Sequence, residues 1–253
     1  MAFEKLREII ELDVEYTTKS ALAISAGKQP AEVVESPVIK LAGMPVIPGS
    51  SLKGALRSTL EAMLAQQGVK VCVPFAAIPK GIRGDEQRRK EYLAKLGRLE
   101  PCQDIENPCP ICAIFGTIGG QAGLSGRAIV LDATTQEGKY NLIERTHVAI
   151  MRDTKSQAEG SLMTLQAVDA GAVFEGKIRI VNPEDWQVGA IAQALKGVKL
   201  LGMGAKKTAG YGELEIEVKS VRSIRFVEGK WESTEVELEP YIEAFAHKFG
   251  EKR

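Results

Sequence analysis

The chain has 253 residues, of which 44% are hydrophobic and 26% are charged, the proportions of a globular protein with a sizeable core. Its 33 basic and 33 acidic residues balance, which neither favours nor excludes a nucleic-acid partner because local placement matters more. We expect no membrane span, since no run of 18 apolar residues occurs. The N-terminal segment is charged and alternating, unlike a secretory signal, so we expect a cytoplasmic protein with no membrane partner.

The first predicted element is a strand at residues 10–16, where apolar and polar residues alternate. A loop of small and polar residues follows at 20–36, and loops of this length inside a domain are usually functional or disordered. Gly43 then separates two short apolar runs. This pattern indicates a small hairpin that leads into a helix.

An amphipathic helix is predicted after a Pro-Gly turn, with Ser50 or Ser51 as its N-cap. Apolar residues recur at helical spacing as far as residue 64. Lys53 and Arg57 are four residues apart and share another face. Cations near a helix N-terminus oppose the macrodipole. They indicate either a bound anion, since free N–H groups there favour phosphate, or an ordinary amphipathic helix.

The segment 69–126 has little regular period and holds all four cysteines of the chain. Cys109 and Cys112 form a CxxC motif, and Cys102 and Cys72 lie upstream. Four soft ligands in a loop-rich insertion predict a structural zinc site. A redox CxxC motif and a disulfide pair are the alternatives, and His147 is a less favoured substitute ligand.

The same segment includes a basic stretch, because residues 80–98 carry seven cations against three acids. A charge run of this kind is usually a solvated face. We interpret residues 80–98 in that way.

The rest of the chain predicts further strands, a second helix and one long hairpin. We predict strands at 127–135, 173–181 and 213–221, a hairpin or arm at 144–164, a helix opening at 183–185, and a final strand and short helix, the latter at 241–249. Without its insertions the order is strand, helix, strand, strand, helix, strand, which is the ferredoxin-like arrangement. One face of such a sheet is open, as in many RNA-binding modules, although a fold alone does not define a function.

A glycine-rich loop lies between the second helix and the strand that follows it. Four glycines surround Lys206 and Lys207, and backbone N–H groups with paired lysines suit phosphate. The order matches neither a P-loop nor the dinucleotide-binding fingerprint. The alternative is a flexible connection with turn glycines. The phosphate interpretation is strengthened by Lys53 and Arg57, which would also lie at an element end of the same small fold.

Three segments in this order resemble one protein family. They are ESPVIKLAGMPVIPGSSLKGALRS at 35–58, CPICAIFGT at 109–117 and GMGAKKTAGYGEL at 202–214. A fourth segment, 145–171, resembles the protruding thumb of that family. From about residue 10 to residue 220, the chain resembles a backbone subunit of type III CRISPR effector complexes, in the RAMP superfamily.

The resemblance implies a single RAMP domain over residues 1–253, of class α+β. Its core would be ferredoxin-like, in the manner of an RNA-recognition motif, with a zinc-bearing insertion and a protruding thumb hairpin. We expect the core at about 9–68, 127–143 and 172–221, the insertion at 69–126, the thumb at 144–164 and a C-terminal extension at 222–253.

The resemblance also implies partners and contact residues. Copies of the subunit would stack along a guide RNA, with other type III subunits and a target RNA. Guide phosphates would be held by the helix start and the glycine-rich loop, through Ser50, Ser51, Lys53, Arg57, Gly204, Lys206 and Lys207. Met151 and Arg152 at the thumb tip would wedge into the guide–target duplex and flip out a nucleotide.

Glu35 stands where catalytic members of the family carry an Asp that is linked to metal-dependent cleavage of target RNA. A carboxylate there would hold Mg²⁺ and help a 2′-hydroxyl attack the adjacent phosphate. Glu is one methylene longer than Asp, so cleavage by this subunit and a non-catalytic scaffold both stay open, with Glu32 as the nearest substitute acid. A third and less favoured hypothesis is a guide-processing nuclease, since such enzymes often use a His, but neither His147 nor His247 lies in a recognised catalytic context.

Overall fold

The computed structural model describes residues 5–25, 36–104, 106–119 and 122–250. Glu32 and Glu35 therefore lie outside the described residues. Within the described part of the chain, no helix is long and apolar enough to cross a membrane.

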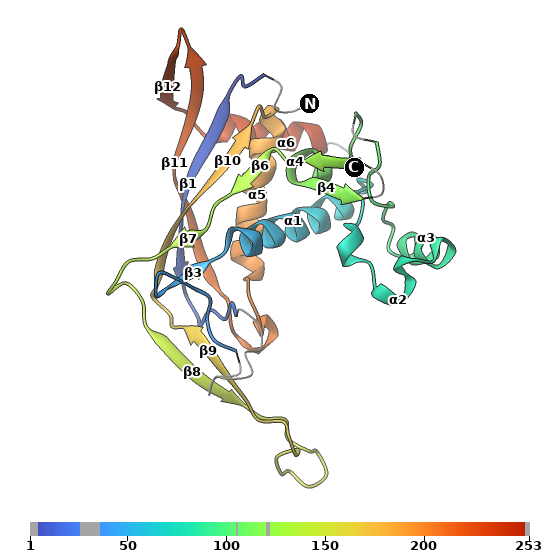
Figure 1. Ribbon diagram of the computed structural model, residues 1–253, viewed down its shortest axis with the longest axis vertical. Coiled ribbons are helices and arrows are strands. Elements are labelled where there is room, and N and C mark those ends of the chain that lie inside the picture. The colour runs from blue at the N-terminus through green and yellow to red at the C-terminus, as the bar shows by residue number, and fades with distance from the viewer. Residues whose placement is uncertain (1–4, 26–35, 105, 120–121, 251–253) are drawn as a thin grey trace.

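The main body is a mixed α and β structure built on one antiparallel sheet (Figure 1). Its eight strands are β1 (Ile9–Thr18), β2 (Lys40–Leu41), β3 (Met44–Ile47), β6 (Ala128–Val130), β7 (Ala133–Thr134), β10 (Val173–Val181), β11 (Leu214–Val227) and β12 (Lys230–Glu235). The strand order is β12-β11-β1-β10-β7-β3-β2, and β6 also pairs with β10. The first strand in the chain is thus central, between β10 and β11.

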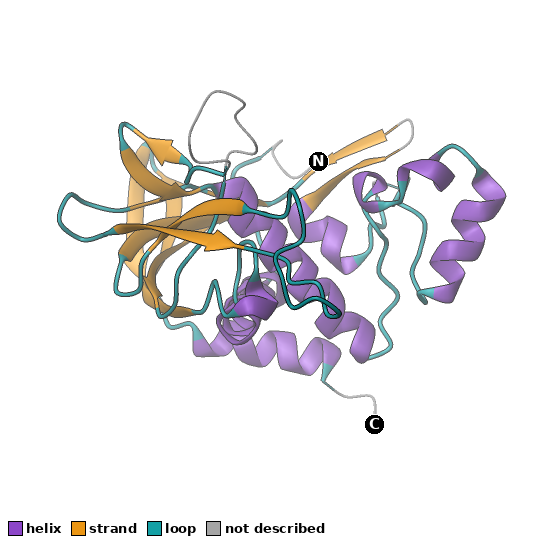
Figure 2. Ribbon diagram, turned by 90° about the horizontal axis from the view of Figure 1, so that it is seen from below, coloured by secondary structure: helices purple, strands orange, loops and turns teal. Residues whose placement is uncertain are grey.

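Three helices lie on one face of this sheet (Figures 1 and 2). They are α1 (Gly49–Gln66), α5 (Asp185–Leu201) and α6 (Glu239–Phe249). Helix α5 packs against both α1 and α6. The predicted final strand and short helix correspond to β12 and α6.

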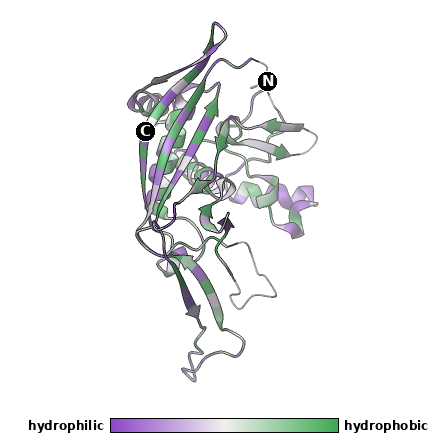
Figure 3. Cartoon of the chain, turned by 60° about the vertical axis from the view of Figure 1, so that its left-hand side comes forward, coloured by the Kyte–Doolittle hydropathy of each residue, from purple (hydrophilic) through white to green (hydrophobic). Residues whose placement is uncertain are grey.

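The core forms where alternating strand residues meet the apolar stripe of the helices. On β1, Ile10, Leu12, Val14 and Tyr16 are buried against the helices, and the residues between them face the other side of the sheet. Figure 3 shows the corresponding alternation of hydrophobic and hydrophilic residues along the strands. The leucines of α1 that recur at helical spacing are all buried. Both periodicities were predicted from the sequence.

The prediction of a serine N-cap for α1 is wrong. Pro48 is the N-cap residue, with φ −60° and ψ 137°, and the helix begins at Gly49. The backbone N–H of Gly49 donates to Oδ1 of Asp132, at 2.7 Å. A carboxylate from another segment, and not a local serine, therefore accepts from a free N–H at the start of the helix.

The predicted strand at 127–135 is two short strands in the structure, and this carboxylate lies between them. Asp132 lies between β6 and β7, and β7 pairs with both β3 and β10. The chain leaves regular pairing where Asp132 turns toward the start of α1.

The insertion at 69–126 contains more regular structure than its sequence pattern indicates. It forms η1 (Phe75–Ala77), α2 (Lys80–Arg83), α3 (Glu86–Lys95), α4 (Pro110–Phe115), and a hairpin of β4 (Gly116–Gly119) and β5 (Ala122–Ser125). Helix α3 buries only Leu93, so its sequence carries no apolar stripe from which a helix could be predicted.

The cations of residues 80–98 largely serve internal contacts. Arg83 donates to the carbonyls of Ala76 and Ile78, and Arg98 donates to the carbonyl of Glu61. Three more cations form ion pairs within this region: Arg88–Asp85, Arg89–Glu100 and Lys90–Glu86. Arg83, Arg89 and Arg98 are half-buried, so the stretch is only in part the solvated face that the sequence predicted. Its contacts do not indicate an RNA-binding patch.

Candidate nucleic-acid interface and metal centre

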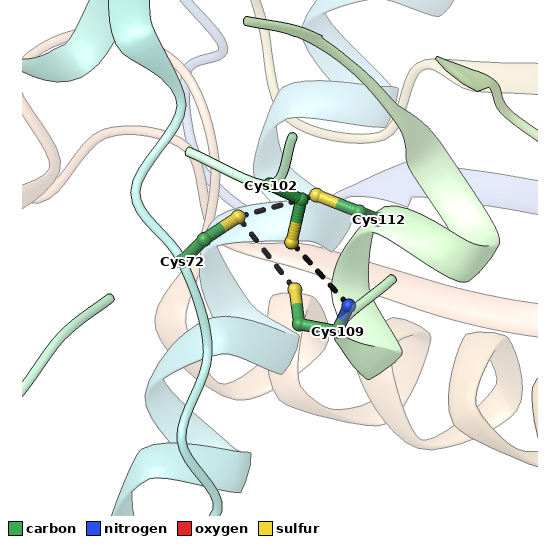
Figure 4. A group of neighbouring side chains, drawn as sticks. All are labelled: Cys72, Cys102, Cys109 and Cys112. Atoms are coloured by element: carbon green, nitrogen blue, oxygen red, sulfur yellow. Dashed lines mark hydrogen bonds between the residues drawn. The ribbon is translucent and has the colours of Figure 1, made fainter. Parts of the chain in front are cut away.

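The four cysteines of the insertion converge on one point (Figure 4). Their four Sγ atoms all lie within 4.8 Å of one another. Cys72 and Cys112 are buried, Cys102 and Cys109 are half-buried, and all four are free thiols. The Sγ of Cys72 lies 3.2 Å from that of Cys112 and 3.6 Å from that of Cys109.

Backbone pairing explains how distant cysteines meet. The N–H of Leu99 donates to the carbonyl of Val71, and the N–H of Val73 donates to the carbonyl of Leu99. This short parallel pairing holds the segment of Cys72 beside the segment that leads to Cys102. The other two cysteines come from one helical turn, because Cys109 is the N-cap of α4 and Cys112 lies in its first turn.

The chemistry of the four thiols fits a soft divalent metal ion. Hydrogen bonding with Cys112 and Cys72 lowers the pKa of Cys109, while the hydrogen bond with Cys109 raises the pKa of Cys112. The neighbouring thiols thus stabilise one thiolate, and a bound cation would favour ionisation of the others. Sulfur ligands at about 2.3 Å from a tetrahedral Zn²⁺ lie roughly 3.7 Å apart, a spacing that the cluster accommodates. The residues therefore fit a closed structural zinc site, with no open position for catalysis.

The start of α1 and the glycine-rich loop meet at a shallow cleft. The cleft has a volume of about 240 Å³ and is lined by Ile24, Ser51, Ala55, Ser58, Thr59, Gly202, Met203, Gly204 and Lys207. The two motifs that the sequence singled out as anion ligands thus share one surface. Of the predicted phosphate ligands, Ser51, Gly204 and Lys207 line the cleft.

The loop that forms one wall of the cleft is held by backbone hydrogen bonds to residues 21–23. The N–H of Gly212 donates to the carbonyl of Ala21, and the N–H of Ala205 donates to the carbonyl of Ala23. Gly204 has φ +89°, and a Cβ there would meet the Ala23 oxygen at 2.7 Å. Glycine is therefore required at this wall for the loop to approach its neighbour closely.

The remaining predicted phosphate ligands lie outside the cleft lining. Ser50 and Lys206 are exposed, and Lys53 is half-buried. Burial, together with the positive charge of Arg57, lowers the pKa of Lys53. Arg57 itself points in another direction, because its guanidinium donates to Glu61, to the carbonyl of Gly116 and to the Sγ of Cys112.

A two-stranded hairpin, β8 (Leu142–His147) and β9 (Met163–Val168), extends away from the body (Figure 1). Met151 and Arg152 lie in its exposed tip, and the Met151 side chain is 39% exposed. Ile150 and Leu162 are exposed too. The tip therefore presents apolar side chains beside a cation, the composition that a base-unstacking wedge needs.

Tyr211 connects this hairpin to the glycine-rich loop, a contact that the sequence did not predict. Its hydroxyl lies 3.0 Å from Nε2 of His147, and Arg145 lies over its ring at 5.4 Å. Tyr211 is buried. The one feature of the sequence that could have indicated this contact is the aromatic residue between two glycines. His147 contacts Tyr211, so it does not take the place of a cysteine in the metal cluster. In the described part of the chain, the candidate metal cluster consists of the four cysteines.

The chain that flanks Glu35 is anchored at the base of the hairpin. The carbonyl of Ser36 accepts from the N–H of Gln166, and the side chain of Gln166 accepts from the N–H of Val38. Before the undescribed residues 26–35, Ile24 lines the cleft. The described chain thus stops beside the cleft and resumes beside β9.

The open face of the sheet is occupied by ion pairs. Glu11 is buried there and pairs with Arg179 and Arg222, at 2.6 and 2.7 Å. Asp13 accepts from Lys177 and Ser220 beside them. Charged groups that neutralise one another in this way leave little field for a phosphate backbone. The cleft and the hairpin are the stronger candidates for an RNA interface.

A model of the RAMP superfamily matches residues 15–215. The chain belongs to the RAMP superfamily. The RAMP match includes the cysteine insertion, the β8–β9 hairpin and the glycine-rich loop, whereas β12 and α6 lie beyond it.

One curated relative aligns along most of its length. The chain is 29% identical over 252 residues to the CRISPR system Cms endoribonuclease Csm3 of Methanocaldococcus jannaschii. The alignment includes 92% of this chain and 88% of the relative.

Proposed function

We propose that this RAMP protein is a guide-RNA-binding backbone subunit of a type III CRISPR effector complex, which positions complementary target RNA. The observation that carries the proposal is the cleft in which the first turns of α1 meet the glycine-rich loop. The similarity to a protein named as a CRISPR endoribonuclease supports it. Further copies of this chain and other type III subunits would be its protein partners.

The strand order supports a ferredoxin-like core within this proposal. In the chain, β1, α1, β6 with β7, β10, α5 and β11 follow one another. In the sheet, the order is β11-β1-β10 and then β6 and β7, which is the order expected for a split βαβ arrangement with both helices on one face. The β8–β9 hairpin would be the thumb, with Met151 and Arg152 as the residues that unstack and flip a nucleotide.

Guide phosphates would bind along the cleft. Lys207 supplies charge and Ser51 a hydroxyl donor, while Gly204 lets a phosphate approach the backbone. Ser50, Lys53 and Lys206 would extend this surface toward neighbouring phosphates.

RNA affinity as a function of salt tests this interface. Replacing Lys206 and Lys207 with Ala should weaken binding of single-stranded RNA and reduce the slope of log K against log salt by about 0.7 for each phosphate that is no longer neutralised. The matched control replaces the exposed lysines of the insertion, Lys80 and Lys95, and should leave the slope unchanged. An equal weakening in the two double variants would refute the cleft as the RNA site.

We further propose that Glu35 takes part in cleavage of target RNA. The relative's name as an endoribonuclease favours cleavage over a purely structural scaffold. The carboxylate would hold Mg²⁺, whose charge would stabilise the phosphate under attack.

The test is a cleavage assay on the reconstituted complex, with Glu35→Ala, Glu35→Asp and the neighbouring control Glu32→Ala. Glu35→Ala should abolish target cuts, while Glu35→Asp and Glu32→Ala should retain them. If the Glu35→Ala complex still cuts target RNA, Glu35 does not take part in cleavage. A wild-type complex that binds target RNA without cutting it would favour the scaffold.

A further inference from the structure

Arg57 lies in the middle of α1, and its side chain is directed toward the cysteine cluster and away from solvent. The side chain is only 16% exposed. Its Nε donates to Oε1 of Glu61 at 2.9 Å, and its Nη1 donates to the carbonyl of Gly116 at 2.9 Å. Its Nη2 lies 3.7 Å from the Sγ of Cys112. The planar fork thus has a partner on each of its three nitrogens.

These contacts link α1 to the segment that carries two of the four cysteines. Cys109 is the N-cap of α4, Cys112 lies in its first turn, and Gly116 is its C-cap. Arg57 therefore holds α4 at its C-terminal end and, through Cys112, close to its first turn. Because α4 is only six residues long, these two contacts constrain the orientation of both cysteines.

The charge of the cluster requires such a partner. Four thiolates around a divalent ion leave a net charge of roughly −2, and a buried charge is costly unless it is paired. An N–H donor to a ligating sulfur disperses that charge and orients the ligand. Glu61 fixes the guanidinium, and Arg98 in turn donates to the carbonyl of Glu61.

We propose that Arg57 is a positioning residue of the cysteine metal centre, which donates to the Cys112 thiolate and secures α4, and is not a ligand of RNA phosphate. The inference rests on the cluster holding a metal ion such as zinc. It is independent of the RNA function proposed for the cleft.

Zinc retention in the full-length protein tests the proposal. We expect Arg57→Ala to lower zinc affinity by about 10- to 100-fold in a competition with a chromogenic chelator, and Arg57→Lys to recover only part of it because an ammonium lacks the fork. Lys53→Ala is the matched control, since this cation lies one turn earlier on α1, and it should retain zinc like the wild type.

A spectroscopic readout covers the case in which Arg57→Ala does not fold. In protein loaded with Co²⁺, the sulfur-to-cobalt charge-transfer bands should shift in Arg57→Lys and not in Lys53→Ala. Unchanged zinc affinity and an unchanged cobalt spectrum in Arg57→Lys would overturn the proposal, as would a drop in RNA affinity in Arg57→Ala with zinc affinity intact. A wild-type protein that binds neither metal would also overturn the proposal. That result would leave the RNA-binding test of the Lys206 and Lys207 variants unchanged.

Discussion

Replacing Gly204 with alanine should damage the cleft far more than the same replacement at Gly210. Both glycines lie in the loop between α5 and β11, and both have positive φ, +89° and +85°. An added Cβ at position 204 would lie 2.7 Å from the carbonyl oxygen of Ala23, whereas nothing lies within 4 Å of a Cβ at position 210. Both variants would therefore carry the strain of a positive φ, but only Gly204→Ala would also create a steric conflict.

The two contributions differ in size. An alanine forced into a left-handed conformation costs about 1–3 kcal/mol at either position. At position 204 the methyl group also pushes away the Ala23 carbonyl, which accepts from the N–H of Ala205 at 2.9 Å. Breaking that hydrogen bond costs about 0.5–1.5 kcal/mol, and overpacking adds about 1–3 kcal/mol. Gly204→Ala should therefore be about 1.5–4.5 kcal/mol less stable than Gly210→Ala.

The assay combines urea denaturation with RNA-binding anisotropy at fixed salt. Gly204→Ala should lower the free energy of unfolding more than Gly210→Ala, and because Gly204 lines the cleft, its RNA affinity should fall by at least about tenfold more. Variants with equal stabilities and equal affinities would refute the steric argument. Equal affinities despite unequal stabilities would show that RNA binds elsewhere.

Three further predictions concern the scaffold. Gly189→Ala should cost about 1–3 kcal/mol in urea denaturation, since its Cβ would collide with a backbone carbonyl of α6. Asp132→Ala should cost about 1 kcal/mol of thermal stability by releasing the Gly49 N–H, and Asp132→Asn, which keeps an acceptor, should cost less. Burial tends to raise the pKa of Asp13, but the hydrogen bond and charge of Lys177 outweigh it and hold this pKa below its ordinary value. The stabilisation is therefore present above about pH 4 and disappears as the pH falls further, so Asp13→Asn should show a shallower acid decline in stability.

Local patterns were sufficient to predict most of the regular elements. The alternation along β1 and the helical spacing of leucines in α1 depend only on which face of an element is buried, so both were predicted correctly. Helix α3 was missed because its residues are charged on almost every side. The serine N-cap was predicted wrongly because local sequence could not reveal that Asp132, 83 residues away, binds the Gly49 N–H.

Residue types at short spacing were enough to define the strand and helix faces and the CxxC motif, whereas the cleft that α1 and the glycine-rich loop share was decided by the tertiary structure. The direction of each side chain on α1 likewise depends on the packing of distant segments. Ser51 faces the cleft with Lys207, whereas Arg57, less than two turns later, faces Cys112. The physical reason is that spacing fixes which residues share a helix face, but the element packed against that face determines what they contact.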